Sequence, residues 1–423
     1  MSFDGPRGLA LMVRRSLQRH LLSTLVTATS MALGCGLVMS VMVVNSAAYE
    51  AFTGGNIGFD AVLGARGSKL QLVLNTIFHL ETSPGNIPWQ LYKEIEADPR
   101  IALAVPYAVG DNYRGFRIVG TTPELFTRFE YQTGRRYTPR EPGRVFDPQY
   151  REAVVGAFVA QQAGLRLGAK FNPYHGVVFD ESAKHEEEYV VVGVLEPTNS
   201  PADRVIWIPI EGIYRMGGHV LRGSGKVFKA EAGAEIPAEH REVSAVMLKL
   251  KSRQAGFSLS QMINGQGKVA TLAWPIDQVM AELFDKLGWV NRVLGLVAWM
   301  VVVVAGFSML AALYNTMSAR RREMAILRAL GARRRTLFAA IVMESTAIAL
   351  LGALLGFVIY AFVMSIAAEL IRSRTGVVIN VFSGHWILPA TPPAAMLVGA
   401  FAGVLPAIKA YRTDVAANLA PVS

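Results

Sequence analysis

The sequence contains a single cysteine, Cys35, so disulfide bonds within the chain are excluded. The P-loop pattern G-x-x-x-x-G-K-[ST] does not occur among the 423 residues, which excludes nucleotide binding in the P-loop manner. A G-x-S-x-G motif is also missing, and His79 with Glu81 lacks a nucleophile and a third partner for acid–base catalysis. We therefore expect no catalytic residue, and neither a cofactor nor a metal ion bound by this chain.

Charged residues are scarce at 17%, whereas hydrophobic residues reach 52%. This composition is too apolar for a soluble protein and too charged for one made only of membrane spans. Residues 48–285 carry 25 basic and 27 acidic side chains, whereas the rest of the chain carries 17 and 5. The basic excess lies beside apolar runs, where it suits anionic lipid and membrane topology. We expect membrane lipid as a partner and no nucleic acid, because the middle segment suggests no basic face.

Four apolar runs are long enough to cross a hydrocarbon core of about 30 Å as helices. They predict transmembrane helices at residues 21–47, 286–319, 336–368 and 386–408. The first run exceeds a typical signal-peptide core and lacks a clean A-x-A site, which favours a retained span over a cleaved signal. Flanking lysines and arginines place the N-terminus, residues 320–335 and the tail at 409–423 in the cytoplasm. Residues 1–20 are expected to form an amphipathic helix on the inner leaflet.

The middle segment, residues 48–285, has the periodicity of a mixed α/β domain. Stretches rich in β-branched residues predict strands at 118–120, 189–195, 205–210 and 243–250. A helix is expected at 88–97, and another after the strand that begins at Val154, where Gly164 ends it. Exposed loops are expected at 184–188 and 216–225, and an extracytoplasmic linker at 369–385. The predicted fold is an α-helical membrane protein with four transmembrane helices and a large α+β extracytoplasmic domain between the first two.

The stretch 320–335 holds seven arginines and one acidic residue, Glu323, between the second and third predicted spans. Met324, Leu327 and Leu330 recur every three residues on one helical face, and Gly331 is placed to end that helix. A short amphipathic helix at the inner surface is suited to docking a partner. The alternative is that the helix lies on lipid with its arginines at the phosphates.

Polar and small residues in the predicted spans, and two histidines in the middle segment, are further candidates for a role. Glu344 lies about two turns into the third span, where a charge costs a few kcal/mol unless it is paired or hydrated. It is a candidate intramembrane polar site, either paired at a subunit interface or close enough to the membrane surface to reach water. His175, His185 and residues 186–188 are interpreted as a solvated acidic loop, because the histidines lack the short spacing of a zinc site. Small residues indicate close helix packing, within the bundle or between subunits, at Gly34, Gly36, Gly352 and Gly356.

Two segments of the chain resemble a known family. RREMAILRALGARRRTLFAAIVMES at 321–345 and LPAIKAYRTDVAANL at 405–419 resemble signatures of the FtsX-like/MacB-type (type VII) ABC transporter permeases. Residues 154–171 and 189–210 resemble the MacB-like periplasmic core domain, and the order of one span, a large outer domain and three spans is also that of the family. The chain is thus similar to a stand-alone permease without a fused ATPase. Residues 62–88 resemble the HrtB-like/MacB-like subgroup.

The resemblance implies a permease subunit in the bacterial inner membrane that couples ATP hydrolysis by a separate ABC ATPase to export or to mechanical transmission. It implies two ATPase copies carrying ATP and Mg, a second permease subunit with a homodimer favoured over a heterodimer, and a periplasmic adaptor or binding protein. The implied ATPase-coupling residues are Arg322, Glu323, Met324, Leu327, Arg328, Leu330 and Gly331. The alternative is a non-transporting FtsX-like regulator that relays ATPase cycles to a periplasmic partner such as a cell-wall hydrolase.

Overall fold

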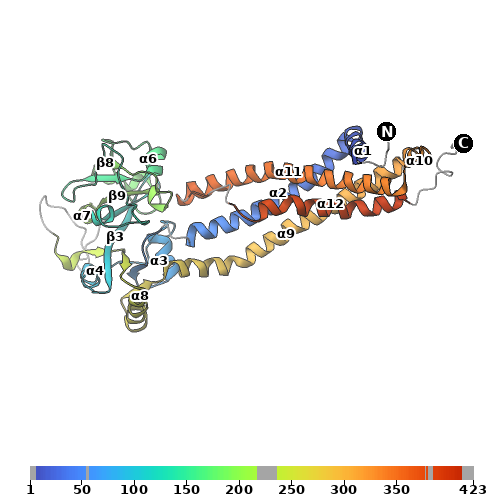
Figure 1. Ribbon diagram of the computed structural model, residues 1–423. Coiled ribbons are helices and arrows are strands. Elements are labelled where there is room, and N and C mark those ends of the chain that lie inside the picture. The colour runs from blue at the N-terminus through green and yellow to red at the C-terminus, as the bar shows by residue number, and fades with distance from the viewer. Residues whose placement is uncertain (1–5, 54–56, 217–235, 377, 380–383, 412–423) are drawn as a thin grey trace. The chain divides into compact units, whose positions relative to one another are not determined.

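The computed structural model of the chain describes residues 6–53, 57–216, 236–376, 378–379 and 384–411 (Figure 1). The chain divides into two compact units, which we call the helical unit and the sheet domain. The helical unit comprises Met1–Ala48, Leu287–Glu369 and Asn380–Ser423. The sheet domain comprises Tyr49–Lys286 and Leu370–Ile379. Neither unit is therefore one continuous segment of the chain.

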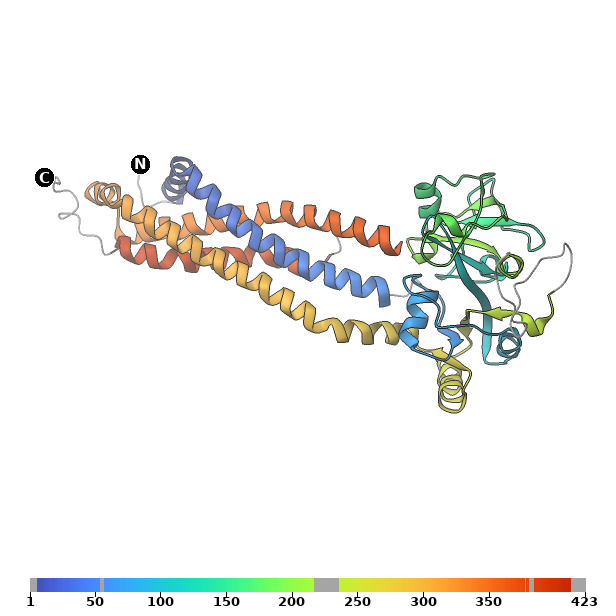
Figure 2. The same cartoon turned by 180° about the vertical axis from the view of Figure 1, so that it is seen from behind.

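Long helices make up the helical unit, and four of the helices described are long and apolar enough to cross a membrane. The helices are α1 (Pro6–Arg19), α2 (Leu21–Thr53), α9 (Ile276–Ala319), α10 (Arg321–Ala329), α11 (Arg334–Thr375) and α12 (Ile387–Tyr411), and one end of each of α2, α9 and α11 belongs to the sheet domain. The candidate spans α2, α9, α11 and α12 run side by side within the helical unit (Figures 1 and 2). α9 and α11 extend past their predicted apolar runs, because polar residues continue a helix without adding to its hydropathy. The first part of the linker predicted at 369–385 accordingly belongs to α11.

Glycine allows α2 and α11 to approach closely. A Cβ atom added at Gly36 would lie 2.8 Å from Cβ of Ile359, and one added at Gly352 would lie 2.6 Å from Cβ of Met31. Side-chain carbons do not approach each other this closely, so the two helices pack at this distance only with glycine there. The sequence left open whether these glycines serve packing within the bundle or between subunits. The structure uses them within a single chain.

A ten-stranded mixed sheet forms the centre of the sheet domain. Its strands are β1 (Ala61–Ala65), β3 (Ile101–Tyr113), β4 (Phe116–Thr121), β5 (Glu152–Val155), β6 (Lys170–Phe171), β7 (Tyr174–His175), β8 (Tyr189–Val194), β9 (Val205–Pro209), β11 (Ala245–Leu250) and β12 (Ala270–Ala273). The order is β12-β1-β11-β3-β4-β9-β5-β8-β6, and β7 pairs with β3. The pairs β4–β9 and β5–β8 are parallel, and the others are antiparallel. A separate antiparallel pair joins β2 (Ile87–Pro88) and β10 (Glu242–Val243).

Hydrophobic side chains are buried on both faces of this sheet. On β9, Ile206 and Ile208 belong to one core, whereas Val205 and Trp207 belong to the opposite one. Because both faces are covered, such strands read in the sequence as unbroken apolar runs. The first core is covered by α4 (Trp89–Glu96), α6 (Ala157–Ala163), α7 (Ile210–Arg215) and α8 (Arg253–Ser260). The second is covered by α3 (Lys69–Thr76), α5 (Glu124–Thr127) and the first turns of α9.

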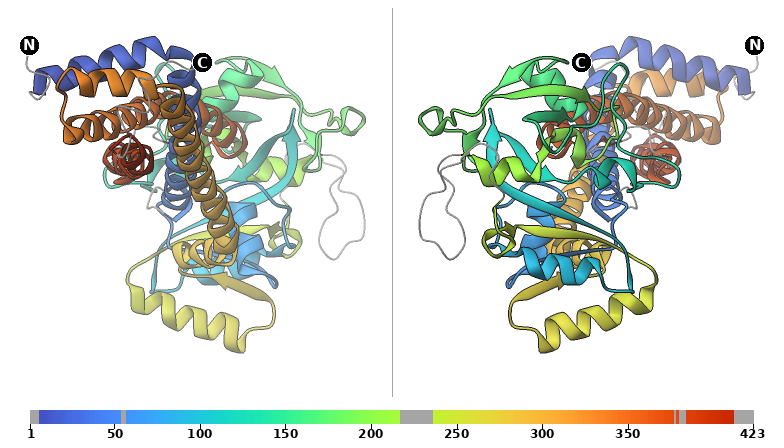
Figure 3. Two further views of the ribbon diagram at one scale, coloured as in Figure 1. Left: turned by 90° about the vertical axis from the view of Figure 1, so that its right-hand side faces the viewer. Right: turned by 90° about the vertical axis from the view of Figure 1, so that its left-hand side faces the viewer.

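Short helical turns complete the sheet domain. They are η1 (Glu181–Ala183), η2 (Pro201–Arg204), η3 (Ala238–His240) and the π-helical η4 (Gln261–Gln266). η4 continues α8, and the two form one protruding helix (yellow in Figure 3). The predicted strands at 118–120, 189–195 and 205–210 and the helix at 88–97 are confirmed, as is the end of α6 at Gly164, which has a φ of +70°. The strand predicted at 243–250 is divided at Ser244 into β10 and β11, which belong to different sheets.

The two predicted loops have different outcomes. In segment 184–188 the exposed-loop prediction is wrong for His185, which is 8% exposed and whose backbone N–H donates to the carbonyl of Pro173 at 2.9 Å. Contacts to distant strands, which spacing along the chain does not show, bury this histidine. In segment 216–225, Met216 is fully buried, and residues 217–225 lie outside the described residues.

Candidate coupling site

The short helix α10 lies between two candidate spans and ends at a glycine. Gly331 has a φ of +99°, a left-handed backbone conformation that favours glycine. Its N–H donates to the carbonyl of Arg328 at 3.0 Å, and the N–H of Ala332 donates to the carbonyl of Leu327 at 3.0 Å. These two bonds form a Schellman motif, which satisfies carbonyl groups at the helix end and turns the chain. The prediction that Gly331 ends this helix is confirmed.

One face of α10 packs against the helical unit, and the other is exposed. Met324 is 6% exposed and packs, with the half-buried Leu327, in a cluster formed by Met317, Leu337, Ile341, Ala407 and Ala410. On the opposite side, Ile326 is 43% exposed and Leu330 is 66% exposed. Arg322 is also exposed. Among the described side chains, the exposed face of α10 and its C-cap thus carries the basic Arg322 and the apolar Ile326 and Leu330 at intervals of four residues, and Ala329 is exposed as well.

This arrangement corrects part of the predicted coupling set. Met324 and Leu327 were predicted to enter a groove on a partner, but the ends of α9, α11 and α12 already bury Met324 within the chain, and Leu327 is half-buried against the same cluster. The three-residue spacing correctly marks an apolar helix face, but spacing alone does not show which molecule covers that face. Leu330 keeps its predicted exposure, and Ile326 joins it as an exposed residue that the pattern did not reveal.

Glu344 is paired within the chain. Its residue is 7% exposed, and its Oε1 accepts a hydrogen bond from Oγ of Ser16 at 2.5 Å. Nη1 of Arg320, whose side chain is 12% exposed, lies 2.9 Å from Oγ of Ser16 and 3.5 Å from both carboxylate oxygens of Glu344. The structure thus differs from both predicted alternatives, a partner at a subunit interface and a carboxylate reaching water. A cation and a hydroxyl from the same chain stabilise this carboxylate.

Glu323 extends this network to the surface of α10. Its carboxylate lies 2.8 Å from Nη1 of Arg19 on α1 and 3.4 Å from Nε of Arg320. Glu323 was predicted to meet a charge on a partner, but these contacts occupy it within the chain. Arg328, predicted to have the same role, is half-buried. Of the charged residues predicted for docking, Arg322 is the one that the structure leaves fully on the surface.

The polar network joins three helices. Ser16 and Arg19 belong to α1, Arg320 lies between α9 and α10, and Glu344 belongs to α11. The sequence pattern did not reveal Ser16 or Arg320 as site residues, since Ser16 and Glu344 are 328 positions apart. The one available signal was the carboxylate itself, because an acidic residue inside a span requires a partner.

Two further contacts fix the neighbouring helix ends. The guanidinium of Arg334, at the start of α11, lies 5.6 Å from the ring centre of Tyr411 in α12. Nζ of Lys409 lies 3.5 Å from the ring centre of Tyr314 in α9. Such cation–π contacts stabilise by about 0.5–1 kcal/mol at exposed sites. These contacts join α12 to α11 and to α9, next to the helix ends that hold α10.

Comparison with known proteins identifies the class that this architecture defines. Residues 24–256 match the MacB-like periplasmic core domain, and residues 295–415 match the FtsX-like permease C-terminal domain. The first match alone covers more than half of the chain. The chain belongs to the FtsX/MacB-type permeases, the transmembrane components of ABC transporters. Members of this family work with an ABC ATPase partner, and the family together with the four apolar helices indicates an inner-membrane protein.

Two solved structures are similar to parts of the chain. The extracellular domain of the noncanonic ABC-type transporter YknZ from Gram-positive bacteria is 12% identical, with 50% of this chain and 97% of that chain covered and a TM-score of 0.28. The periplasmic region of MacB from Actinobacillus actinomycetemcomitans is 12% identical, with 54% and 94% covered and a TM-score of 0.32. A search of curated proteins found no match.

Proposed function

We propose that this chain is a permease subunit that receives motion from a separate ABC ATPase at α10 and transmits it to the sheet domain, for export or for mechanical signalling. The observation that supports this function is the exposed face of α10, formed by Arg322, Ile326 and Leu330, on a helix whose other face is firmly held. Exposed apolar side chains beside a basic one suit a groove on a protein partner.

The contacts that hold α10 against the neighbouring helices support transmission of force. Met324 is buried in the cluster below it, the Schellman motif fixes its end, and Glu323 and Arg320 connect its start to α1 and α11. A push on the exposed face therefore moves the attached helices, because α10 cannot roll freely against them. A helix lying loosely on lipid would need none of these contacts.

The helices on either side of α10 provide a stiff path. α9 has 44 residues and α11 has 42, and neither contains proline. At 1.5 Å per residue they extend about 66 and 63 Å, more than the thickness of a membrane. α12 is different, because it is 25 residues long and contains Pro392, Pro393 and Pro406. Proline inside a helix removes a hydrogen bond and bends the helix, so α12 is the less suitable path.

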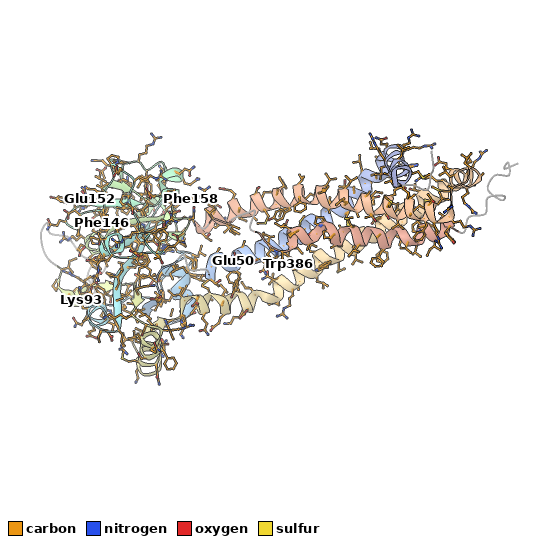
Figure 4. The ribbon with its side chains drawn as sticks, in the orientation of Figure 1. Glu50, Lys93, Phe146, Glu152, Phe158 and Trp386 are labelled. Carbon is orange, nitrogen blue, oxygen red and sulfur yellow. The ribbon has the colours of Figure 1, made fainter. Side chains whose placement is uncertain are left out.

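Both stiff helices contribute residues to the sheet domain. The first turns of α9 place Ile276, Val279 and Met280 in one of its cores. At the end of α11, the guanidinium of Arg372 lies 5.9 Å from the ring centre of Phe158, which is labelled in Figure 4. A shift along either helix axis would therefore act directly on packed side chains of that domain.

The proposal includes the partners implied by the family resemblance. Two ATPase subunits carrying ATP and Mg would act on two permease subunits, with a homodimer favoured and the coupling helix in the cytoplasm. The non-transporting regulator would use the same contacts at α10. Reconstitution of the purified complex separates the two, because an exporter moves a molecule across the vesicle membrane and a regulator does not.

Substitutions on the exposed face of α10 test the docking step. We expect Ile326→Asp and Leu330→Asp to abolish co-purification of the ATPase and stimulation of ATP hydrolysis. Burying an unpaired carboxylate in an apolar contact should cost at least about 2 kcal/mol, or roughly 30-fold in affinity. The matched controls Ile326→Leu and Leu330→Met keep the apolar surface and should bind normally.

The choice of position matters for this experiment. An acidic residue at Leu327 would also disturb the buried cluster, so loss of binding there would not separate docking from folding. Ile326 and Leu330 avoid this problem because both are well exposed. Normal ATPase binding by both acidic variants, at unchanged permease levels, would contradict the proposed role of α10.

A further inference from the structure

Strand pairing in the sheet domain brings together three potential metal ligands. Asp111 on β3 lies directly opposite His175 on β7 in the antiparallel register. His185 follows η1, where the hydrogen bond from its N–H to the carbonyl of Pro173 folds the segment back toward β7. Asp111 and His185 are 74 positions apart in the sequence, yet their side chains are in contact.

The distances suit a tetrahedral metal ion. Oδ1 of Asp111 lies 3.3 Å from Nδ1 of His175 and 3.2 Å from Nε2 of His185. One atom from each of the three side chains lies within 4.8 Å of the other two. Ligand atoms of a tetrahedral zinc ion, with bonds of about 2.0–2.1 Å, are about 3.3–3.4 Å apart. Small side-chain rotations would therefore place all three atoms around one ion.

The cluster is rigid on one side and open on the other. Asp111 is fully buried and the side chain of His185 is 7% exposed, whereas that of His175 is 55% exposed. An ion can therefore reach the cluster from the side of His175. This side also leaves room for water as a fourth ligand, the arrangement found at zinc sites with three protein ligands.

Backbone geometry around Asp111 fixes the position of its carboxylate. The pairing of β3 with β4 shifts register between Val109 and Asp111, and such bulges turn a side chain toward a new direction. The neighbouring Asn112 donates from its amide to the carbonyl of Gly176 at 2.9 Å, and the N–H of Gly176 donates to the carbonyl of Gly110 at 2.8 Å. These bonds hold the residues after β7 against β3.

We propose that Asp111, His175 and His185 bind one zinc ion in the sheet domain. Two imidazole nitrogens and one carboxylate oxygen form a donor set that zinc accepts, whereas magnesium and calcium prefer oxygen ligands alone. The bound ion ties residues 174–185 to β3, so zinc availability controls how firmly this part of the domain is held. This site is separate from α10 and does not depend on its role in coupling.

Zinc titration of the full-length chain tests the proposal. The protein, purified in detergent and freed of metal with a chelator, is titrated with zinc chloride by calorimetry. We expect one zinc ion per chain, and an affinity lowered by at least about 100-fold in His175→Ala and Asp111→Asn, since loss of a ligand exceeds loss of an outer-shell partner. Glu188→Gln, which changes an exposed acidic residue three positions after His185 that pairs with Lys170, should bind zinc as the unaltered protein does.

A spectroscopic measurement separates a built site from loose attraction to acidic residues. Cobalt(II) in place of zinc should show the absorption bands of a tetrahedral site, and these bands should vanish in His175→Ala. Because the His175 side chain is mostly exposed, this variant should keep its fold, which circular dichroism checks. Absence of zinc binding, unchanged binding in both ligand variants, or an equal loss in Glu188→Gln would each overturn the proposal.

Discussion

Both units of this protein bury a carboxylate, but they surround it differently. In the helical unit, Glu344 is enclosed by Ser16 and by Arg320, whose side chain is 12% exposed. In the sheet domain, Asp111 is fully buried but meets His175, whose side chain is 55% exposed. The first cluster is closed by protein groups, and the second is open on one side.

The difference indicates what each cluster does. Arginine remains charged under all ordinary conditions, so its pairing with Glu344 is a permanent connection between helices. Histidine nitrogens are metal ligands, and the open side gives an ion access to them. The helical unit therefore uses Glu344 to hold α1, α10 and α11 together. The sheet domain encloses Asp203 with hydrogen bonds from Thr198 and Asn199, but it leaves Asp111 open on the side where we propose that zinc binds.

We expect the largest loss of stability when the cation that pairs with Glu344 is removed. Arg320→Met leaves the Glu344 carboxylate buried without its cation, a change that typically costs about 3–5 kcal/mol. We expect a strongly lowered thermal unfolding midpoint in detergent, together with loss of ATPase stimulation. The exposed Arg322→Met is the control for stability and should change it by less than about 0.5 kcal/mol.

A double variant separates the pairing itself from loss of the arginine side chain. Arg320→Met with Glu344→Met replaces the whole pair by apolar groups, which is often close to neutral in stability. We expect it to recover most of the stability lost in Arg320→Met. The single variant Glu344→Met completes the comparison. If the double variant loses as much free energy of unfolding as the two single variants together, Glu344 and Arg320 are not coupled, and their pairing does not hold the helices together.

Substitutions in the cluster of Asp111, His175 and His185 should lower the stability less, when no metal is present. Asp111→Asn keeps the shape of the side chain and much of its hydrogen bonding, so it should cost about 1–2 kcal/mol. His175→Ala should cost less than about 0.5 kcal/mol, because that side chain is mostly exposed. Thermal unfolding with a chelator present measures both. A loss in Asp111→Asn as large as that in Arg320→Met would remove the distinction between open and closed clusters.

The two clusters also show how far the sequence could predict this protein. Apolar runs and β-branched stretches predicted the four long helices and several strands, because these patterns depend only on residues within one helix or strand. The clusters depend on pairing between distant elements: Ser16 with Glu344, and Asp111 with His175 through the β3–β7 register. The spacing of residues along the chain does not indicate which distant elements pair, so His175 and His185 were interpreted as part of a solvated loop. For the same reason, Met324 was assigned to a partner instead of to the chain's own helices.

The smallest change in stability is expected at an ion pair on the surface of the sheet domain. This pair is a reference for the electrostatic contribution of the two buried carboxylates. Nη1 of Arg144 lies 2.6 Å from Oε2 of Glu152, which is labelled in Figure 4. The hydrogen bond from Arg144 lowers the pKa of Glu152. A carboxylate with a lowered pKa in the folded state adds stability above its unfolded pKa of about 4.3. This stability is lost as the pH falls through the lower, folded pKa.

Arg144→Gln should therefore slightly lower the unfolding midpoint at pH 7, and this difference from the unaltered protein should vanish in acid, where Glu152 is protonated in both. Arg166→Gln, another exposed arginine in the same domain, is the matched control and should show no pH-dependent difference. The effect should stay small because the Arg144 side chain is 57% exposed and water screens the pair. A difference that persists unchanged at low pH would show that Arg144 acts through packing and not through the charge of Glu152. In that case the pair could not serve as the electrostatic reference for the two buried acids.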